Sequence, residues 1–409
     1  MRPYFTRERF GRPQFLAALL LLAFFAQAVF LVHSELSPMQ SLDSSEALRI
    51  GEGWKQWHGR GIAAAPFLDT SPAVGDPLHT NTGFDDEHSP LLYLASSAPL
   101  VAWPRDFDRE SSPYWRWLPR LPFLACGVIL GASLWYVARR LCGNTGGFIA
   151  LIFYCFSPSL IQASAVWHTE PEIAAAWGAF GTIFTAIAVA HTLYAPREVI
   201  LWNWRRIVLL GVSLSIAIGS QFSMIVLIPL ALGFLLYVAP VRRQAGFVIW
   251  MAACIIAFVL LFGFYFFHAH AFADSMHNAA FWGVTWRGFT FPAVYKQIAI
   301  QIGRGCPALA LALPFTLAIY AVWRRTRYFG NTAPLLIAVL FIILAIAHTH
   351  LAGAGFLIAA VPFLFIFVSG VLADLLETRY RSLVGACILG LLAAYVVHTL
   401  LKLSQVPQG

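Results

Sequence analysis

The densest group of side chains that could carry out chemistry lies between Val32 and Leu121. Twelve of the 19 acidic residues fall in residues 34–118. Asp43 and Glu46 are three residues apart, so on a helix their carboxylates share one face. Such a carboxylate could act as a general base and take a proton from an acceptor hydroxyl. A structural role fits equally, because Asp43 or Ser44 could cap a helix that runs to about Trp57.

A second acidic cluster follows at Asp85-Asp86-Glu87-His88. Three consecutive carboxylates are hard oxygen ligands that suit a divalent cation, and an imidazole is a further metal ligand. We therefore regard a divalent metal ion as a candidate cofactor, with Asp43, Glu87 and His88 as ligands. The alternative is a solvated acidic turn.

Two charged residues stand at the ends of apolar segments. Arg120 precedes one such segment, where a guanidinium could bind a lipid phosphate through two parallel hydrogen bonds or could simply reach the membrane interface. Glu172 begins another, and a carboxylate at that depth is costly unless it is paired. It could also stabilise the N-terminus of its own helix. Both positions are candidate substrate-binding sites.

The rest of the chain is strongly apolar, with 59% hydrophobic and 11% charged residues. A soluble globular domain would carry roughly 25% charged residues. Apolar runs of about 20 residues recur along the chain, and each can cross a hydrocarbon core as a helix that satisfies its own backbone hydrogen bonds. We predict an all-α polytopic membrane protein in which residues 1–409 form a single transmembrane domain.

Eleven membrane-spanning helices are predicted. The segment 90–103 is too short to cross and is interrupted by Pro99, which is typical of an interfacial helix. Two long loops remain outside: residues 34–118, which carry juxtamembrane helices and the candidate active site, and residues 268–303. The predicted spans lie near 14–33, 119–138, 146–163, 172–193, 207–220, 222–239, 245–266, 304–322, 332–348, 354–374 and 382–401.

The basic residues predict how these helices are oriented. If segment 90–103 stays at the surface, most of the arginines after the first loop fall in loops on the same side of the membrane as the N-terminus. By the positive-inside rule, this places the N-terminus in the cytoplasm and the C-terminus outside. The expected location is the cell (inner) membrane. The net charge is +8, but the basic residues are dispersed in pairs between spans, so no nucleic-acid partner is expected. The cytoplasmic groups are Arg139 and Arg140; Arg197, Arg205 and Arg206; Arg242 and Arg243; Arg324, Arg325 and Arg327; Arg379 and Arg381.

Read in order, these clusters form a pattern. The chain gives Asp43-Ser44, then His88-Ser89-Pro90-Leu91, then Arg120-Leu121-Pro122, then Pro171-Glu172. In this order it resembles the C-type glycosyltransferase superfamily, in the branch of the protein O-mannosyltransferases and aminoarabinose transferases. It differs from that branch at Ser44, where the family usually has Glu, and at Ser89, where it has a second Pro.

The resemblance implies a glycosyltransferase that moves a hexosyl or pentosyl group from a polyprenyl-phosphate-linked donor. The acceptor would be a hydroxyl of a glycan, lipid or protein on the extracytoplasmic side. Asp43, next to Glu46, is the implied general base, and Arg120 with Lys55 would bind the donor phosphate. Glu87 or Glu172 would orient the acceptor or bind the metal, and His88 would face the developing charge on the phosphate.

Two other functions remain open. A transporter or flippase of a lipid-linked substrate would show inverted repeats and ionisable residues at mid-membrane. The centres of the spans are nearly free of charge, which argues against it. A non-catalytic protein of the same fold is the second alternative, and the replacement at Ser44 is its main support.

Overall fold

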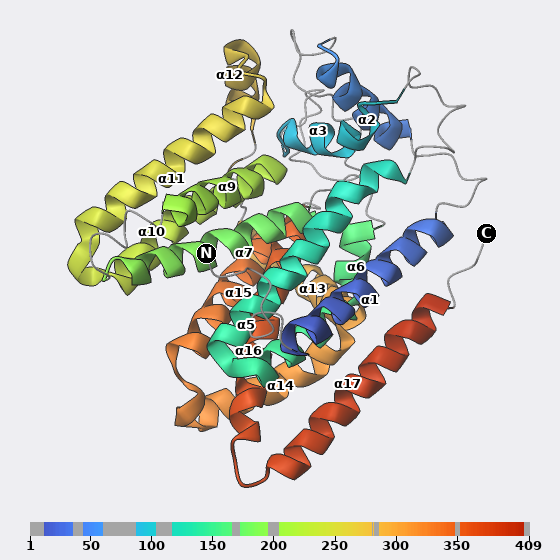
Figure 1. Cartoon of the computed structure of the whole chain (residues 1–409), viewed down its shortest axis with the longest axis vertical. Helices are drawn as coiled ribbons and strands as arrows, with labels where there is room; N and C mark the ends of the chain where they lie inside the picture. Colours follow the sequence, from blue (N-terminus) through green and yellow to red (C-terminus); the bar gives the residue numbers. More distant parts are fainter. Residues whose placement is uncertain are drawn as a thin grey trace.

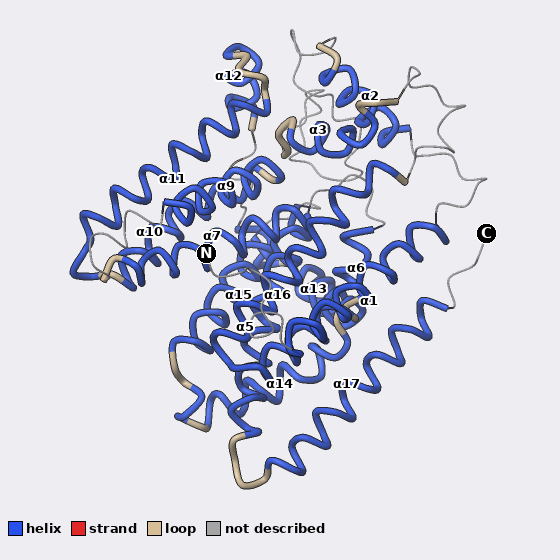
Figure 2. Tube along the Cα trace, in the orientation of Figure 1, coloured by secondary structure: helices blue, strands red, loops and turns tan. Residues whose placement is uncertain are grey.

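The structure is a computed structural model of the whole chain, and it is helical throughout the part that it describes (Figure 2). It describes residues 12–35, 44–59, 87–103, 117–165, 172–194, 204–279, 281, 286–347 and 352–404. The prediction of an all-α membrane protein is confirmed. The N-terminal residues, Asp43, Asp85, Asp86 and Pro171 lie outside the described residues.

Seven described helices are long and apolar enough to cross a membrane, and an eighth results if two helices that meet at a bend are counted as one span. Every predicted span overlaps helix within the described residues. Two of them, 207–220 and 222–239, correspond to helices shorter than the seven, so the number of eleven crossings stays a prediction. The seven are α1 (Arg12–Glu35), α5 (Leu121–Cys155), α7 (Glu172–Thr192), α11 (Arg243–Phe264), α15 (Phe329–Ala347), α16 (Ala352–Leu376) and α17 (Arg381–Ser404).

Helix α5 is a hairpin rather than one straight rod. Gly143 adopts φ 72°, a left-handed conformation that glycine reaches without steric cost, and the chain reverses there. The two limbs then pack against each other, because the Tyr154 hydroxyl donates to the carbonyl oxygen of Gly127 at 2.5 Å. The second limb continues through Ser157 into α6 (Pro158–Ala165). This arrangement accounts for the predicted spans 119–138 and 146–163.

The predicted spans 207–220 and 222–239 meet at Gln221. The first is α9 (Trp204–Ser220), and the second is the 3-10 turn η3 (Phe222–Val226) followed by α10 (Leu227–Val238). Gln221 has an extended backbone, with φ −155° and ψ 115°, which separates the two helices. The Gly219-Ser220-Gln221 sequence is therefore a genuine break, and it becomes part of the candidate site below.

Helix α16 is the centre of the bundle. In the most apolar stretch of this helix, 94% of the residues are buried inside the protein. The helix packs against α5, α7, α14 (Pro307–Val322) and α15. Aromatic rings fill these contacts: Phe365 stacks on Phe153 of α5, and Phe363 lies against Phe180 of α7. Between helices in lipid, close packing of this kind is the main stabilising contribution.

The outer helices present apolar side chains to their surroundings. In the most apolar stretch of α11 only 17% of the residues are buried within the protein, and in that of α17 only 22% are. Exposed apolar surface on this scale would be unfavourable in water, and it is expected where the solvent is lipid. Figure 1 shows both helices at the periphery, with α11 and α12 (Ala269–Asn278) on one side and α17 on the other.

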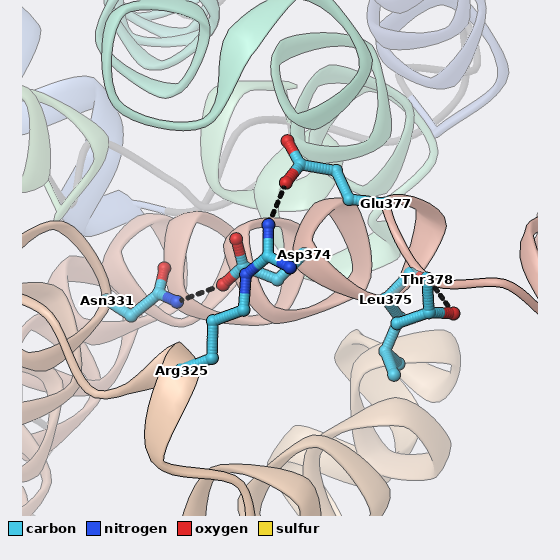
Figure 3. Close-up of polar contacts among 6 residues, drawn as sticks. All are labelled: Arg325, Asn331, Asp374, Leu375, Glu377 and Thr378. Carbon is cyan, nitrogen blue, oxygen red and sulfur yellow. Dashed lines mark hydrogen bonds and ion pairs between the residues drawn. The ribbon is translucent and has the colours of Figure 1, made fainter.

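The loops predicted to be cytoplasmic meet at one end of the bundle, which we call the basic end. Arg325 forms an ion pair of 2.6 Å with Glu377, and Asn331, which is fully buried, donates to the Asp374 carboxylate at 3.0 Å (Figure 3). Asn331 also donates to the carbonyl oxygen of Thr326. These contacts join the loop before α15 to the end of α16.

The opposite end carries α2 (Ser44–Trp57) and α3 (Leu91–Ser97), which lie together above the start of α5 (Figure 1). We call it the loop end. With its 3-10 extension η1 (Ala98–Leu100), α3 spans ten residues and about 15 Å at 1.5 Å per residue. That is half of a hydrocarbon core, so the segment is too short to cross, as predicted for residues 90–103.

The second predicted external loop is largely helical. After α12 come η5 (Trp286–Thr290) and α13 (Pro292–Gly305), which meets α14 at Cys306 at an angle of 111°. Pro307 is the first residue of α14, where its missing N–H is tolerated. The predicted span 304–322 therefore begins three residues later, at Pro307, and Arg304 belongs to the helix that precedes it.

Candidate functional site

Helices α2 and α3 pack closely enough to form one unit. A side chain on Gly53 would overlap the carbonyl oxygen of Tyr93, so only glycine permits this approach. The Trp57 indole donates to the carbonyl oxygen of Leu94 at 3.0 Å. Trp57 also makes an edge-on ring contact with Phe266 at the end of α11. The juxtamembrane helix predicted to end near Trp57 is thereby fixed to two other elements.

A small apolar cluster connects this unit to the start of α5. Its buried members are Ile50, Trp54 and Leu100, with Trp103 and Leu118 packed against them. Leu118 begins η2 (Leu118–Arg120), the turn that leads into α5. Trp54, Trp57 and Trp103 of the first loop therefore have packing roles, and the turn that carries Arg120 is positioned by the same cluster that positions α2.

The segment from Glu87 to Ser89 is held against the break between α9 and η3. The Phe222 N–H donates to the carbonyl oxygen of Glu87 at 2.8 Å, and the Ser89 N–H donates to that of Gly219 at 3.1 Å. The Ser89 hydroxyl donates to the same Gly219 oxygen at 2.7 Å. Glu87 and His88 are half-buried at this point. The first loop and the α9–η3 break thus share one backbone framework.

Ser89 has a local role that proline could not fill. Its hydroxyl oxygen accepts a hydrogen bond from the Leu91 N–H at 3.2 Å, at the start of α3. Its own N–H and hydroxyl both donate to Gly219. Proline lacks both donors. Where this chain departs from the His-Pro-Pro-Leu pattern, the serine therefore provides an additional connection between α3 and α9.

Arg120 and Glu172 are both buried, with 5% and 7% of their surfaces exposed. Arg120 ends η2 and precedes α5, and Glu172 is the first residue of α7, as predicted. Burial of charged groups at membrane depth is costly and is seldom retained without a function. A guanidinium can bind a phosphate through two parallel hydrogen bonds, and a carboxylate can accept from a hydroxyl.

The remaining predicted site residues lie on or beside α2. Lys55 is exposed and forms an ion pair of 2.6 Å with Glu52 on the same helix. Glu46 lies in the first turn of α2, and Asp43, which precedes the helix, is outside the described residues. Their assignments as base and phosphate ligand stay predictions. Among the described residues there is no group of three His, Cys, Asp or Glu side chains that could hold a metal ion. The predicted set needs Asp43, so it remains untested.

Gln221 is a site residue that sequence reasoning did not select. It is buried, donates to the Ser223 hydroxyl at 2.7 Å, and packs so closely on Gly355 of α16 that a side chain there would overlap its amide oxygen. The only signal in the sequence was the Gly219-Ser220-Gln221 break. Gln221 connects the central helix to the framework that holds Glu87 to Ser89.

Taken together, the loop end presents an acid and an imidazole at residues 87 and 88, with a buried guanidinium and a buried carboxylate at the starts of two spans. These ionisable groups of both signs lie at the same end of the bundle, and we treat them as a candidate site for an anionic, polar substrate.

Comparison with protein families gives one match. Residues 115–265, less than half of the chain, match the family described as dolichyl-phosphate-mannose-protein mannosyltransferase. The matched part runs from η2 to the end of α11, so it contains Arg120 and Glu172. No curated protein sequence matches the chain.

Solved structures share the fold over most of the chain. The oligosaccharyltransferase AglB from Archaeoglobus fulgidus, in complex with an inhibitory peptide and a dolichol-phosphate, superposes with a TM-score of 0.60 at 12% identity. The match covers 96% of this chain and 56% of AglB. ArnT from Cupriavidus metallidurans bound to undecaprenyl phosphate gives 0.55 at 15% identity, over 91% of this chain and 62% of ArnT.

These similarities confirm, at the level of the fold, the resemblance read from the sequence. At such identities they carry no further conclusion about substrates. The chain spans little more than half the length of AglB, and not quite two thirds of the length of ArnT.

Proposed function

We propose that this chain, which has the C-type glycosyltransferase fold, transfers a sugar from a polyprenyl-phosphate-linked donor to an acceptor hydroxyl at the loop end. The observation that carries the proposal is the burial of Arg120 and Glu172 at the starts of α5 and α7, within the part of the chain that matches the mannosyltransferase family. The solved structures of AglB in complex with a dolichol-phosphate and of ArnT bound to undecaprenyl phosphate support a lipid-phosphate donor.

Arg120 is the proposed ligand of the donor phosphate. When the sugar leaves, the bond between the anomeric carbon and the phosphate oxygen breaks, and the electron pair stays on the phosphate. A fixed cation beside that oxygen stabilises the charge as it develops. Because η2 and the α2–α3 unit pack together, the turn that carries Arg120 is fixed before the donor binds, which limits the reorganisation needed.

Asp43 is the proposed general base, with Glu46 nearby in the first turn of α2. The acceptor oxygen attacks the anomeric carbon, and its proton passes to the Asp43 carboxylate. General-base catalysis of this kind contributes about 10²–10⁴-fold in rate. Glu87 and Glu172 are proposed to orient the acceptor, because each carries a carboxylate that can accept from a hydroxyl. Lys55 is a secondary phosphate ligand at the exposed face of α2.

A divalent cation fits this scheme, and Glu87, His88 and Asp43 would hold it. Glu87 and His88 are half-buried, and the Phe222 N–H fixes the backbone of Glu87. The ion would supply Lewis-acid stabilisation of the phosphate charge.

The transferred group is proposed to be a hexose or pentose, and the acceptor a glycan, lipid or protein. The loop end is assigned to the extracytoplasmic side, with the N-terminus in the cytoplasm of a multi-pass inner-membrane protein. The grouping of the basic loops at the opposite end supports this orientation. Arg325 and Glu377 lie at this basic end, and the ring contact between Tyr237 and Phe329 shows that the end of α10 lies there too.

The test is transfer by the purified protein from a panel of polyprenyl-phosphate sugars, with release of polyprenyl phosphate as the readout. Release that requires an acceptor supports a transferase. A flippase predicts instead that sealed vesicles move the lipid-linked sugar across the bilayer without cleaving it. A non-catalytic protein of the same fold predicts neither cleavage nor movement.

A further inference from the structure

A cavity of about 510 Å³ lies at the loop end, where α1, α6, α13, α16 and α17 meet. None of the candidate site residues whose side chains the structure describes lines it. Its walls are mostly apolar and include Leu31, Ile161, Ile358 and Val361. Pockets of this size commonly hold small ligands or part of a larger one.

Two cations lie at this cavity. Arg304, near the end of α13, and Lys402, near the end of α17, both line it, although they are distant in sequence. Both are exposed, and neither forms an ion pair within the described residues. Among the residues that the structure describes, the lining also includes the amides of Gln162 and Gln301 and no acidic residue. The cavity therefore combines apolar walls with positive charge that no described acidic residue neutralises.

The position of these cations is unusual for the topology. In a membrane protein, basic residues accumulate on the cytoplasmic side, and the loop end is assigned to the other side. After the first loop, the sequence places only Arg287, Lys296, Arg304 and Lys402 there. Two of these four reach the same cavity, which indicates that their charge serves binding rather than topology.

The backbone adds to the positive potential. Two helices begin at the wall of the cavity: α6 at Pro158 and α14 at Pro307, next to Cys306. The N-terminus of a helix carries a partial positive charge and favours anions. The wall itself is tightly fixed, because the Ser157 hydroxyl lies 2.9 Å from the Cys306 sulfur and 3.1 Å from the carbonyl oxygen of Gly305.

We propose that this cavity binds the phosphate-bearing end and the first tail carbons of an anionic membrane lipid. The phosphate would lie between Arg304 and Lys402, and the tail would lie along the apolar walls. Lateral access from the bilayer is consistent with the exposed apolar surface of α17. The inference goes beyond the proposed function, because binding of such a lipid does not require that the chain transfer a sugar.

The experiment measures equilibrium binding to the purified full chain in discs of neutral lipid. The probes are polyprenyl monophosphate, phosphatidylglycerol and uncharged polyprenol. The test variant is Arg304→Gln with Lys402→Gln, and Gln301→Glu is a second variant that adds an opposing charge. Lys296→Gln is the control: it removes a cation two turns away on α13, about 12 Å at 1.5 Å per residue and beyond the ~8 Å screening length at physiological salt.

We expect the two anionic lipids, or polyprenyl monophosphate alone, to bind the wild type more tightly than polyprenol. The double variant should lose about tenfold or more in affinity, as expected for losing charge-assisted hydrogen bonds, while Lys296→Gln stays within twofold. Binding of polyprenyl monophosphate alone would identify a second site for polyprenyl phosphate, separate from the one proposed at Arg120. Binding of both anionic lipids would identify a general site for anionic lipids.

Equal binding of polyprenol, or unchanged affinity in both the double variant and Gln301→Glu, would overturn the proposal. Thermal unfolding confirms that each variant is folded, and because all four replaced side chains are at least partly exposed, no loss of fold is expected. Lipid binding that depends on Arg304 and Lys402 in a protein that transfers no sugar would contradict the proposed function and leave this inference intact.

Discussion

The Ser89 hydroxyl donates to the carbonyl oxygen of Gly219 at 2.7 Å, across 130 positions of sequence. This contact joins the first loop, at the start of α3, to the end of α9, where the chain breaks before Gln221. Because Glu87 and His88 directly precede Ser89, the position of both side chains depends on this contact. The framework of the candidate site is therefore built from two segments that are far apart in the chain.

Replacing Ser89 tests this framework. Ser89→Ala leaves the Gly219 oxygen with one donor fewer and should cost about 1 kcal/mol in the free energy of unfolding. Ser89→Pro, which restores the family pattern, removes both donors and should cost more. Thermal unfolding in detergent measures the effect. Ser133→Ala is the matched control, because the Ser133 hydroxyl donates only within its own helix, to Ile129. Equal losses for Ser89→Ala and Ser133→Ala would contradict the account.

The contact between α2 and α3 gives a second prediction. Gly53→Ala places a methyl group on the carbonyl oxygen of Tyr93, so α2 must move away from α3. Gly51→Ala, on the same helix, meets nothing within 4 Å and should stabilise α2 by up to about 1 kcal/mol, because alanine is the better helix former. We expect Gly53→Ala to lower sugar transfer at least tenfold while Gly51→Ala retains it. Similar activities in the two variants would show that the α2–α3 packing does not position the site.

The basic end should contribute to stability rather than to chemistry. Asn331→Ala removes the amide that donates to Asp374 and to the Thr326 carbonyl, and it leaves a buried gap. A loss of about 2–3 kcal/mol in the free energy of unfolding is expected, with activity per folded molecule unchanged. Arg325→Gln breaks an exposed ion pair and a weak cation–π contact with Trp323, and it should cost about 1 kcal/mol or less. A fall in the activity of folded Asn331→Ala protein would contradict this separation of roles.

The proposed orientation can be tested by labelling in intact cells. A cysteine at Lys55 should react with a membrane-impermeant maleimide, because it lies on the exposed face of α2 at the loop end. A cysteine at Arg325 should react only after the membrane is permeabilised. Cys387, which is already exposed on α17, is first replaced by alanine to remove the background. Labelling in the reverse order would invert the topology and place the candidate site in the cytoplasm.

The sequence predicted those parts of the fold that depend on local composition. Apolar length located the membrane helices, and the interruption at Pro99 separated the surface segment 90–103 from the spans. The break at Gln221 was also visible, because Gly219 and Ser220 interrupt an apolar run. Arg120 is a candidate because a guanidinium at the start of a span can bind a lipid phosphate, and Glu172 because a carboxylate at that depth is costly unless paired. The structure places both at helix starts and buries them.

Other features could not be predicted, because they arise from contacts between distant segments. No periodicity indicates that Ser89 meets Gly219 or that Arg304 and Lys402 reach one cavity. The bend at Cys306 lies close to the predicted boundary between the loop 268–303 and the span 304–322, but the sequence did not indicate that a helix, α13, would precede it.

The proposed function requires that this chain cleave a polyprenyl-phosphate sugar with Arg120 as phosphate ligand and Asp43 as base. The most direct measurement is release of polyprenyl phosphate by purified wild type, Arg120→Ala and Asp43→Asn, with folding checked in each by thermal unfolding. The account predicts acceptor-dependent release by the wild type and a loss of at least about 100-fold in both variants. Release that is indifferent to both substitutions, or no release by the wild type from any donor, would contradict it.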